Sequence, residues 1–134
     1  MRLILILILL IKTKTGSTGS GKTTQVPQYI LDNYAQQQRY CNVVVTQPRR
    51  IAAISIAKRV CQERSWSLGS LVGYQVARDR CVSEDTRLTY MTTGVLLQKL
   101  ISTKNMNQFT HVIIDEVQQC FYIYLICGIL SCTC

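Results

Sequence analysis

Acidic residues are scarce in this chain of 134 residues. Asp and Glu total 7 against 15 Lys and Arg, which gives a formal net charge of +8. This balance favours a polyanionic partner, because each Lys or Arg placed on a phosphate releases counterions. A generic basic surface without a specific partner is the alternative.

The chain also lacks the C-x-x-C spacing of zinc sites, although it has 7 cysteines. No apolar run reaches the roughly 20 residues that cross a bilayer as a helix. The two longest runs cover 3–11 and 121–130, and Gly128 interrupts the second. We therefore expect no zinc site and no stable membrane insertion. The first run favours a buried parallel strand, with a secretory signal core as the alternative.

What the chain has is a glycine-rich motif, G-S-T-G-S-G-K-T at 16–23, which fits G-x-x-x-x-G-K-[ST]. Such a loop turns its backbone N–H groups onto a polyphosphate, while the lysine reaches the β- and γ-phosphates and the threonine hydroxyl binds Mg²⁺. A flexible polar loop is the alternative. The predicted ATP-binding residues of this segment are Gly16, Thr18, Gly19, Ser20, Gly21, Lys22, Thr23 and Thr24.

A second motif, V-I-I-D-E at 112–116, places two carboxylates directly after an apolar strand. Asp115 is predicted to hold Mg²⁺ together with Thr23, and Glu116 to contact the same metal region. Glu116 would also orient or deprotonate the water that attacks the γ-phosphate. Lys22 and Glu116 are thus the predicted catalytic residues. Two solvated acids in a turn are the alternative for Asp115 and Glu116.

Apolar runs of strand length alternate with segments of helical period. This order predicts an α/β fold built from parallel βαβ units, with the ligand site at the carboxyl ends of the strands. Expected strands cover 3–11, 42–46, 71–76, 88–91 and 111–114, and expected helices cover 22–38, a segment that starts at Pro48, and 93–102.

Each expected helix has a candidate apolar face. The residues predicted to pack inward are Val26, Ile30 and Tyr34 in the first helix, Ala53, Ala57, Val60 and Cys61 in the second, and Val95, Leu96, Leu100 and Ile101 in the third.

Five ordered segments resemble the successive motifs of DEAH-box RNA helicases. They are G-S-T-G-S-G-K-T-T-Q-V-P-Q at 16–28, T-Q-P-R-R-I-A-A-I-S-I-A-K-R-V at 46–60, V-G-Y-Q-V at 72–76, T-R-L-T-Y-M-T-T-G-V-L-L-Q-K-L at 86–100 and T-H-V-I-I-D-E-V at 110–117. The segments 29–34 and 66–76 most resemble the tudor-domain-bearing branch of that family.

The resemblance implies an incomplete three-layer RecA-like domain, a P-loop NTPase sheet with helices on both faces. Residues 16–117 would form the first ATP-binding lobe, preceded by an irregular apolar strand at 1–15 and followed by an apolar, Cys-rich tail at 118–134. The parent activity would be ATP hydrolysis coupled to RNA unwinding, with ATP and Mg²⁺ as cofactors. A cytoplasmic location follows, where thiols stay reduced, and the branch implies germline granules and small-RNA silencing of transposons.

The resemblance also assigns residues that the bare sequence does not. Arg49, Arg50, Thr93 and Gly94 match positions that bind the sugar-phosphate backbone of single-stranded RNA. Arg59 matches an arginine that stacks on adenine in this family, and an exposed helix charge is the alternative.

The sequence departs from the family at Gln118, which stands where the family has a histidine that couples nucleotide state to domain closure. Beyond it the resemblance ends, and the second RecA-like lobe with its arginine finger has no counterpart at 118–134. We expect a truncated product that binds nucleotide but hydrolyses little. The alternatives are a catalytically inactive nucleotide- and RNA-binding module and a small nucleotide kinase, although no segment remains for a kinase lid.

Overall fold

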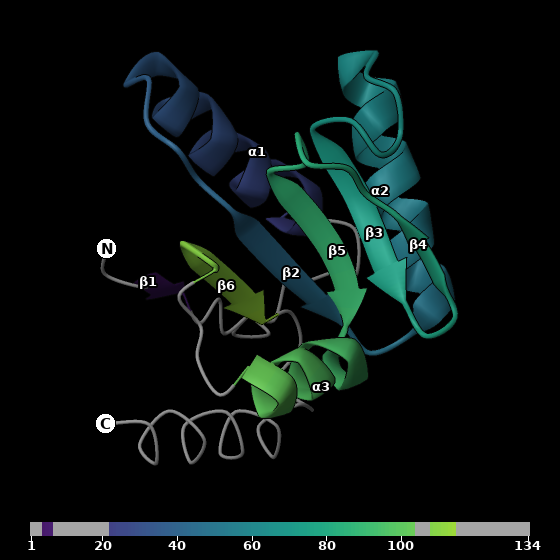
Figure 1. Cartoon of the computed structure of the whole chain (residues 1–134). Helices are drawn as coiled ribbons and strands as arrows, with labels where there is room; N and C mark the ends of the chain where they lie inside the picture. The colour runs from purple at the N-terminus through teal and green to yellow at the C-terminus, as the bar shows by residue number, and fades with distance from the viewer. Residues whose placement is uncertain (1–3, 7–21, 104–107, 115–134) are drawn as a thin grey trace, which may run out of the picture.

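The computed structural model describes residues 4–6, 22–103 and 108–114. The elements in chain order are β1 (Ile4–Ile6), α1 (Lys22–Gln36), β2 (Val43–Gln47), α2 (Arg50–Arg64), β3 (Val72–Val76), β4 (Asp79–Cys81), β5 (Leu88–Thr92), α3 (Thr93–Thr103) and β6 (His111–Ile114). The strands form one six-stranded sheet in the order β1-β6-β2-β5-β3-β4 (Figure 1). The predicted α/β class is confirmed. The predicted first strand, 3–11, is described only at β1.

β2 lies in the middle of the sheet and pairs in parallel with both β5 and β6. Its Val45 is opposite Tyr90 on one side and Ile113 on the other. Every residue of β2 is buried, as expected for a strand covered on both faces. The apolar runs of the sequence therefore predicted the central strands correctly.

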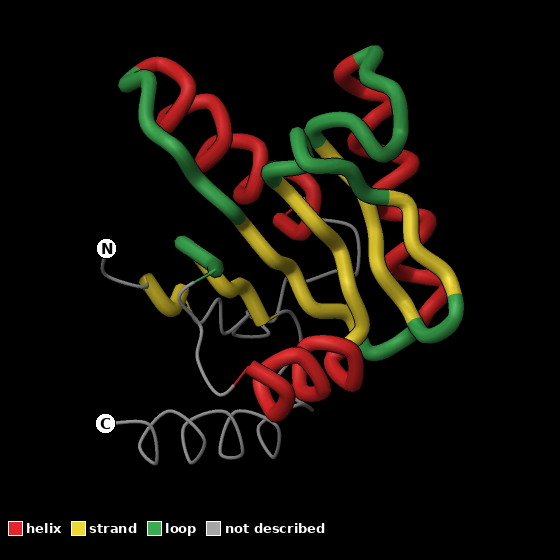
Figure 2. The backbone as a smooth tube through the Cα atoms, viewed as in Figure 1, coloured by secondary structure: helices red, strands yellow, loops and turns green. Residues whose placement is uncertain are grey.

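Side chains of β2 alternate between two hydrophobic clusters. Val43 and Val45 pack with the buried residues of α1 and α2, whereas Val44 packs with those of α3. Because successive strand residues point to opposite faces, the helices must cover both faces. In Figure 2, α1 and α2 lie behind the strands and α3 lies at the opposite side, near the arrowhead ends of Figure 1. The predicted three-layer arrangement is confirmed.

β4 was not predicted, and the expectation of parallel units alone was wrong at this edge. It pairs antiparallel with β3, with Tyr74 opposite Cys81. The strand has three residues that are exposed or half-buried, so it carries no alternation that a sequence reading can detect. The connection turns at Arg78, whose φ of 67° is in the left-handed region.

The predicted inward face of α1 was partly wrong. Its buried residues include Thr24, Gln28 and Leu31, whereas the predicted Ile30 and Tyr34 pack only at the margin of the core. The helix packs against both the sheet and the neighbouring α2, and its buried Gln28 contacts α2. Apolar spacing therefore selected residues at the edge of the buried face of α1 and missed the polar residues at its centre.

α2 fits its prediction closely. Ala53, Ala57, Val60 and Cys61 are all buried, and the small alanines allow the helix to lie near the sheet. The helix begins at Arg50 with Arg49 as its N-cap residue, two positions later than a start at Pro48. Arg49 makes no side-chain cap hydrogen bond.

α3 buries the predicted Val95, Leu96 and Leu100. Ile101 was predicted wrongly, since 62% of it is exposed. One residue advances a helix by about 100°, and that rotation carries Ile101 away from the stripe that faces the sheet. The cluster that α3 covers is small, and a fourth apolar position is not needed to close it.

The one histidine of the chain is a buried residue at the start of β6. The His111 Nδ1 atom lies 2.9 Å from Thr110 Oγ1, and its ring meets Tyr34 edge-on with centroids 5.2 Å apart. Burial lowers the pKa of His111. His111 therefore binds a proton less readily in the folded state than in the unfolded chain.

We expect acid to destabilise the fold through His111. Its contribution is complete above the unfolded pKa of about 6.5 and is lost as the pH falls from there toward the lower folded pKa. Melting temperatures at about pH 7.5 and about pH 5.5 measure this. The wild type should lose more than His111→Gln, which cannot take the proton, and equal losses would contradict this origin.

Candidate functional site

The strands β2, β5 and β6 end side by side at one edge of the sheet. Gln47 pairs with Thr92 and Thr46 with Ile114, each within one residue of a strand end. Arg49 and Arg50 follow β2, Thr93 and Gly94 follow β5, and the segment containing Asp115 follows β6. In Figure 1 the arrowheads of β2 and β5 meet at the start of α3. The structure thus brings the described RNA-binding candidates to a single edge.

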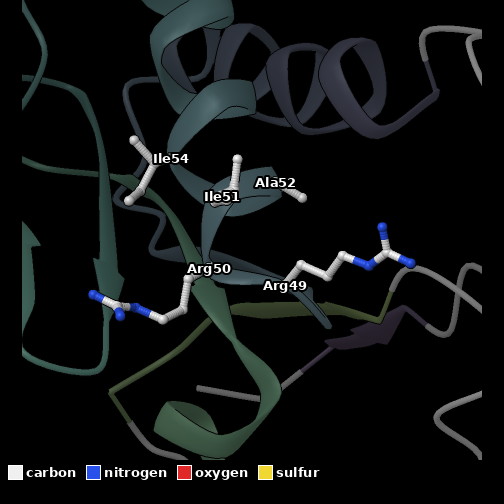
Figure 3. A pocket seen from close by; sticks show the side chains of 5 residues that line it. All are labelled: Arg49, Arg50, Ile51, Ala52 and Ile54. Atoms are coloured by element: carbon white, nitrogen blue, oxygen red, sulfur yellow. The ribbon is translucent and has the colours of Figure 1, made fainter.

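Two exposed arginines stand at the start of α2. Arg49 and Arg50 line an open depression of about 770 Å³ together with Ile51, Ala52 and Ile54. Figure 3 shows the two guanidinium groups extending in opposite directions from the first turn. The first turn of α2 contains no acidic residue. The helix dipole and the two cations therefore add to a positive potential that suits phosphate.

The start of α3 offers backbone rather than charge. Thr93 is buried and Gly94 is exposed. A Cβ atom built on Gly94 would have no heavy atom within 4 Å, so the backbone there is open to a ligand. The first turn of α3 also lacks acidic residues, which leaves a second helix N-terminus suited to an anion beside the first.

α1 begins at Lys22, where the glycine-rich motif ends. Thr24 is buried in its first turn. Apart from Arg59, the other predicted nucleotide and metal residues lie outside the described part of the chain or have no described side chain. They are Gly16, Thr18, Gly19, Ser20, Gly21, Lys22, Thr23, Asp115 and Glu116, and Gln118 lies outside it as well. Their assignments remain predictions.

Arg59 is not brought to the edge formed by Arg49 and Arg50. It lies nine residues beyond Arg50 on α2, which is about 13 Å along the helix axis. The side chain is 67% exposed, and its Nε atom donates to Glu63 Oε1 at 3.3 Å. The contact is an exposed i,i+4 ion pair, of a kind worth a few tenths of a kcal/mol. Such a weak pair leaves Arg59 available to another partner.

A polar cluster between α1 and α2 was missed in the sequence. Gln28 is buried and contacts Arg64, whose guanidinium also pairs with Asp32. The sequence contained only an indirect signal: Gln28 carries an amide in a helix whose inward face was predicted from apolar residues alone. Arg64 also stacks over Trp66, with 5.1 Å between the guanidinium carbon and the ring centroid.

The described cysteines, Cys41, Cys61 and Cys81, are free thiols. Burial raises the pKa of both Cys41 and Cys61, so neither is poised as a thiolate nucleophile. Among the described residues no helix is long and apolar enough to cross a membrane.

A mostly parallel α/β sheet with helices on both faces, in which the sequence G-x-x-x-x-G-K-T leads into α1, is the architecture of a P-loop NTPase lobe. The chain belongs to the DEAD/DEAH box helicase family, whose family model matches residues 12–123.

Three relatives place it further. The "ATP-dependent RNA helicase TDRD9" of Rattus norvegicus is 62% identical over 104 residues, the "Probable ATP-dependent RNA helicase spindle-E" of Anopheles gambiae 61% and the TDRD9 helicase of Danio rerio 59%, the last two over the same length. The matched part is 78% of this chain but only 7% to 8% of each relative. The chain thus resembles one segment of these proteins, and the resemblance to the tudor-domain-bearing branch is confirmed.

Proposed function

We propose that this chain is the ATP- and RNA-binding first lobe of an ATP-dependent RNA helicase. The observation that carries the proposal is the edge where β2, β5 and β6 end together, because it gathers the segments that match the RNA and Mg²⁺ motifs. The parent reaction would be ATP hydrolysis coupled to unwinding or remodelling of RNA.

On the nucleotide side, the loop 16–23 would hold the phosphates of ATP, and Lys22 would neutralise the β- and γ-phosphates. Thr23, Asp115 and Glu116 offer oxygen ligands, which Mg²⁺ prefers. Mg²⁺ would bridge phosphate oxygens and stabilise the charge that develops in phosphoryl transfer. Glu116 would hold the attacking water. Arg59, which is exposed and only weakly paired, would be free to move onto the adenine ring.

On the RNA side, the cations and open backbone at the edge would bind phosphates of a single strand. Arg49 and Arg50 are exposed, and the site at Gly94 admits a backbone at close range. Contacts to phosphate and sugar carry no sequence information, so these groups would position RNA without selecting its sequence. The net charge of +8 agrees with such binding.

For the whole protein, a second RecA-like lobe would be the partner that completes the ATP site. Gln118 in place of histidine would weaken the link between nucleotide state and closure of the two lobes. Because the relatives are named TDRD9 and spindle-E, we also propose a cytoplasmic, germline-granule setting in small-RNA silencing.

Replacing Arg49 and Arg50 together with alanine tests the RNA side. The affinity for single-stranded RNA should fall to a similar extent for every sequence. The slope of log affinity against log salt concentration should flatten by about one to two units, because binding without these two contacts releases fewer counterions. Fluorescence anisotropy over a salt series measures both quantities.

The matched control is Lys58→Ala with Arg59→Ala, which removes the same charge from an exposed part of the same helix. Its salt slope should stay close to that of the wild type in nucleotide-free buffer. A loss of binding confined to one RNA sequence, or equal flattening by both double variants, would contradict the assignment of the edge.

A further inference from the structure

A buried amide joins the two helices that flank the core. Gln28 is 8% exposed on α1. Its Oε1 atom accepts a hydrogen bond from Arg64 Nε at 2.7 Å, and its Nε2 atom donates to the Thr24 carbonyl oxygen at 2.8 Å. Nε2 also lies 3.4 Å from Glu63 Oε2. Gln28 thus connects the last turn of α2 to the first turn of α1.

The chemistry of the neighbours fixes the orientation of this amide. A guanidinium can only donate, whereas a carbonyl and a carboxylate can only accept. Oε1 must therefore face Arg64, and Nε2 must face Thr24 and Glu63. In the reversed orientation, Nε2 would face the donors of Arg64, and Oε1 would face the two acceptors of Thr24 and Glu63. One orientation of the amide is therefore strongly favoured.

Arg64 is itself held from several sides. It pairs with Asp32 on α1 and stacks on Trp66. The helix ends at this residue, with Ser65 as a left-handed C-cap that donates to the Cys61 and Gln62 carbonyls. The guanidinium is therefore a fixed point from which Gln28 extends toward the start of α1.

The far end of this connection lies two residues from Lys22, where α1 begins. Thr24 is buried in that first turn. We propose that Gln28 is a positioning residue: anchored by Arg64, it fixes the first turn of α1, from which Lys22 would contact the polyphosphate. The inference rests on the proposed nucleotide function. Gln28 itself touches no ligand.

Glu63 gives the same cluster a weaker second arm. One of its carboxylate oxygens accepts from Gln28 and the other from Arg59, at 3.4 Å and 3.3 Å. The arm toward Arg59 is exposed and longer than the bonds of Gln28 to Arg64 and Thr24. We therefore expect changes at Gln28 to affect binding of the phosphates, and changes at Arg59 to affect binding of the adenine base.

The test compares inorganic tripolyphosphate with a fluorescent ATP analogue, both with Mg²⁺, on the 134-residue chain. Gln28→Met keeps the side-chain length and removes the amide, while Arg64 retains Asp32 and Glu63 retains Arg59. We expect both ligands to bind about three- to tenfold more weakly, as for a lost hydrogen bond linked to charge. Arg59→Ala should weaken the ATP analogue alone.

Gln28→Glu is the second variant, because it keeps the acceptor for Arg64 but sets a carboxylate against the Thr24 carbonyl and Glu63. Adding Glu63→Gln relieves the charge repulsion, so the melting temperature should recover while tripolyphosphate affinity stays low. Gln37→Met is the matched control, since Gln37 is exposed directly after α1 and its side-chain partners among the described residues are Asn33 and Arg39.

Unchanged tripolyphosphate affinity in Gln28→Met, or an affinity that recovers in step with the melting temperature, would overturn the positioning role and leave the proposed function standing. Failure of the wild-type chain to bind either ligand in a Lys22-dependent way would overturn the proposed function and this inference with it.

Discussion

Replacing Lys22 with alanine is expected to reduce binding of an Mg²⁺–ATP analogue by about 10- to 100-fold. The estimate follows from the roughly 1.5–3 kcal/mol that a hydrogen bond to a charged group contributes. Lys22 is the lysine of the glycine-rich motif and the first residue of α1. Its ammonium would meet the β- and γ-phosphates where the helix dipole already favours negative charge.

Lys58→Ala is the control for this change. Lys58 is an exposed lysine on α2, so its removal alters the net charge of the chain by the same amount without touching the predicted loop. Titration of the fluorescent analogue, followed by competition with unlabelled ATP, gives both affinities. Equal losses in the two variants would mean that general charge, and not a phosphate site at Lys22, holds the nucleotide.

The sequence allowed the central part of this fold to be predicted because burial on both faces leaves a strong signal. Val43, Val44 and Val45 are fully buried, and such a β-branched run has few structures open to it besides a covered parallel strand. Once the strands are parallel, their carboxyl ends lie at one edge, so the segments that begin at Arg49 and Thr93 follow neighbouring strand ends. The meeting of these segments at one edge was thus predictable, whereas the roles of the individual residues stay predictions.

The remaining differences come from packing that one-dimensional periodicity does not contain. Gln28 is buried because α2 supplies Arg64 and Glu63, residues more than thirty positions away. Ile101 is exposed because α3 covers only a narrow part of the sheet. β4 forms because a turn at Arg78 brings a short polar segment beside β3. In each case tertiary packing determines the outcome, and the local sequence pattern does not reveal it.

Replacing Gly73 with alanine should destabilise the fold by about 3 kcal/mol, near the upper end for overpacking. Gly73 lies in β3, and a Cβ atom built there would be 2.2 Å from the Cys81 carbonyl oxygen and 2.9 Å from Val82 Cγ1. The closer neighbour is backbone and cannot rotate away. The substitution must therefore push the chain that leaves β4 off the sheet. Thermal unfolding should show a melting temperature lower by roughly 10 °C.

Gly94→Ala provides the contrast, because a Cβ atom there meets no heavy atom within 4 Å. Its stability should change by less than about 1 kcal/mol and in the favourable direction, since alanine is the better helix former. Loss of stability at both glycines would point to backbone freedom as the common cause. Loss of stability at Gly73 alone identifies the close approach of β4 as the reason that this position excludes a side chain. The β3–β4 hairpin, which the sequence pattern did not reveal, then determines that position 73 must be glycine.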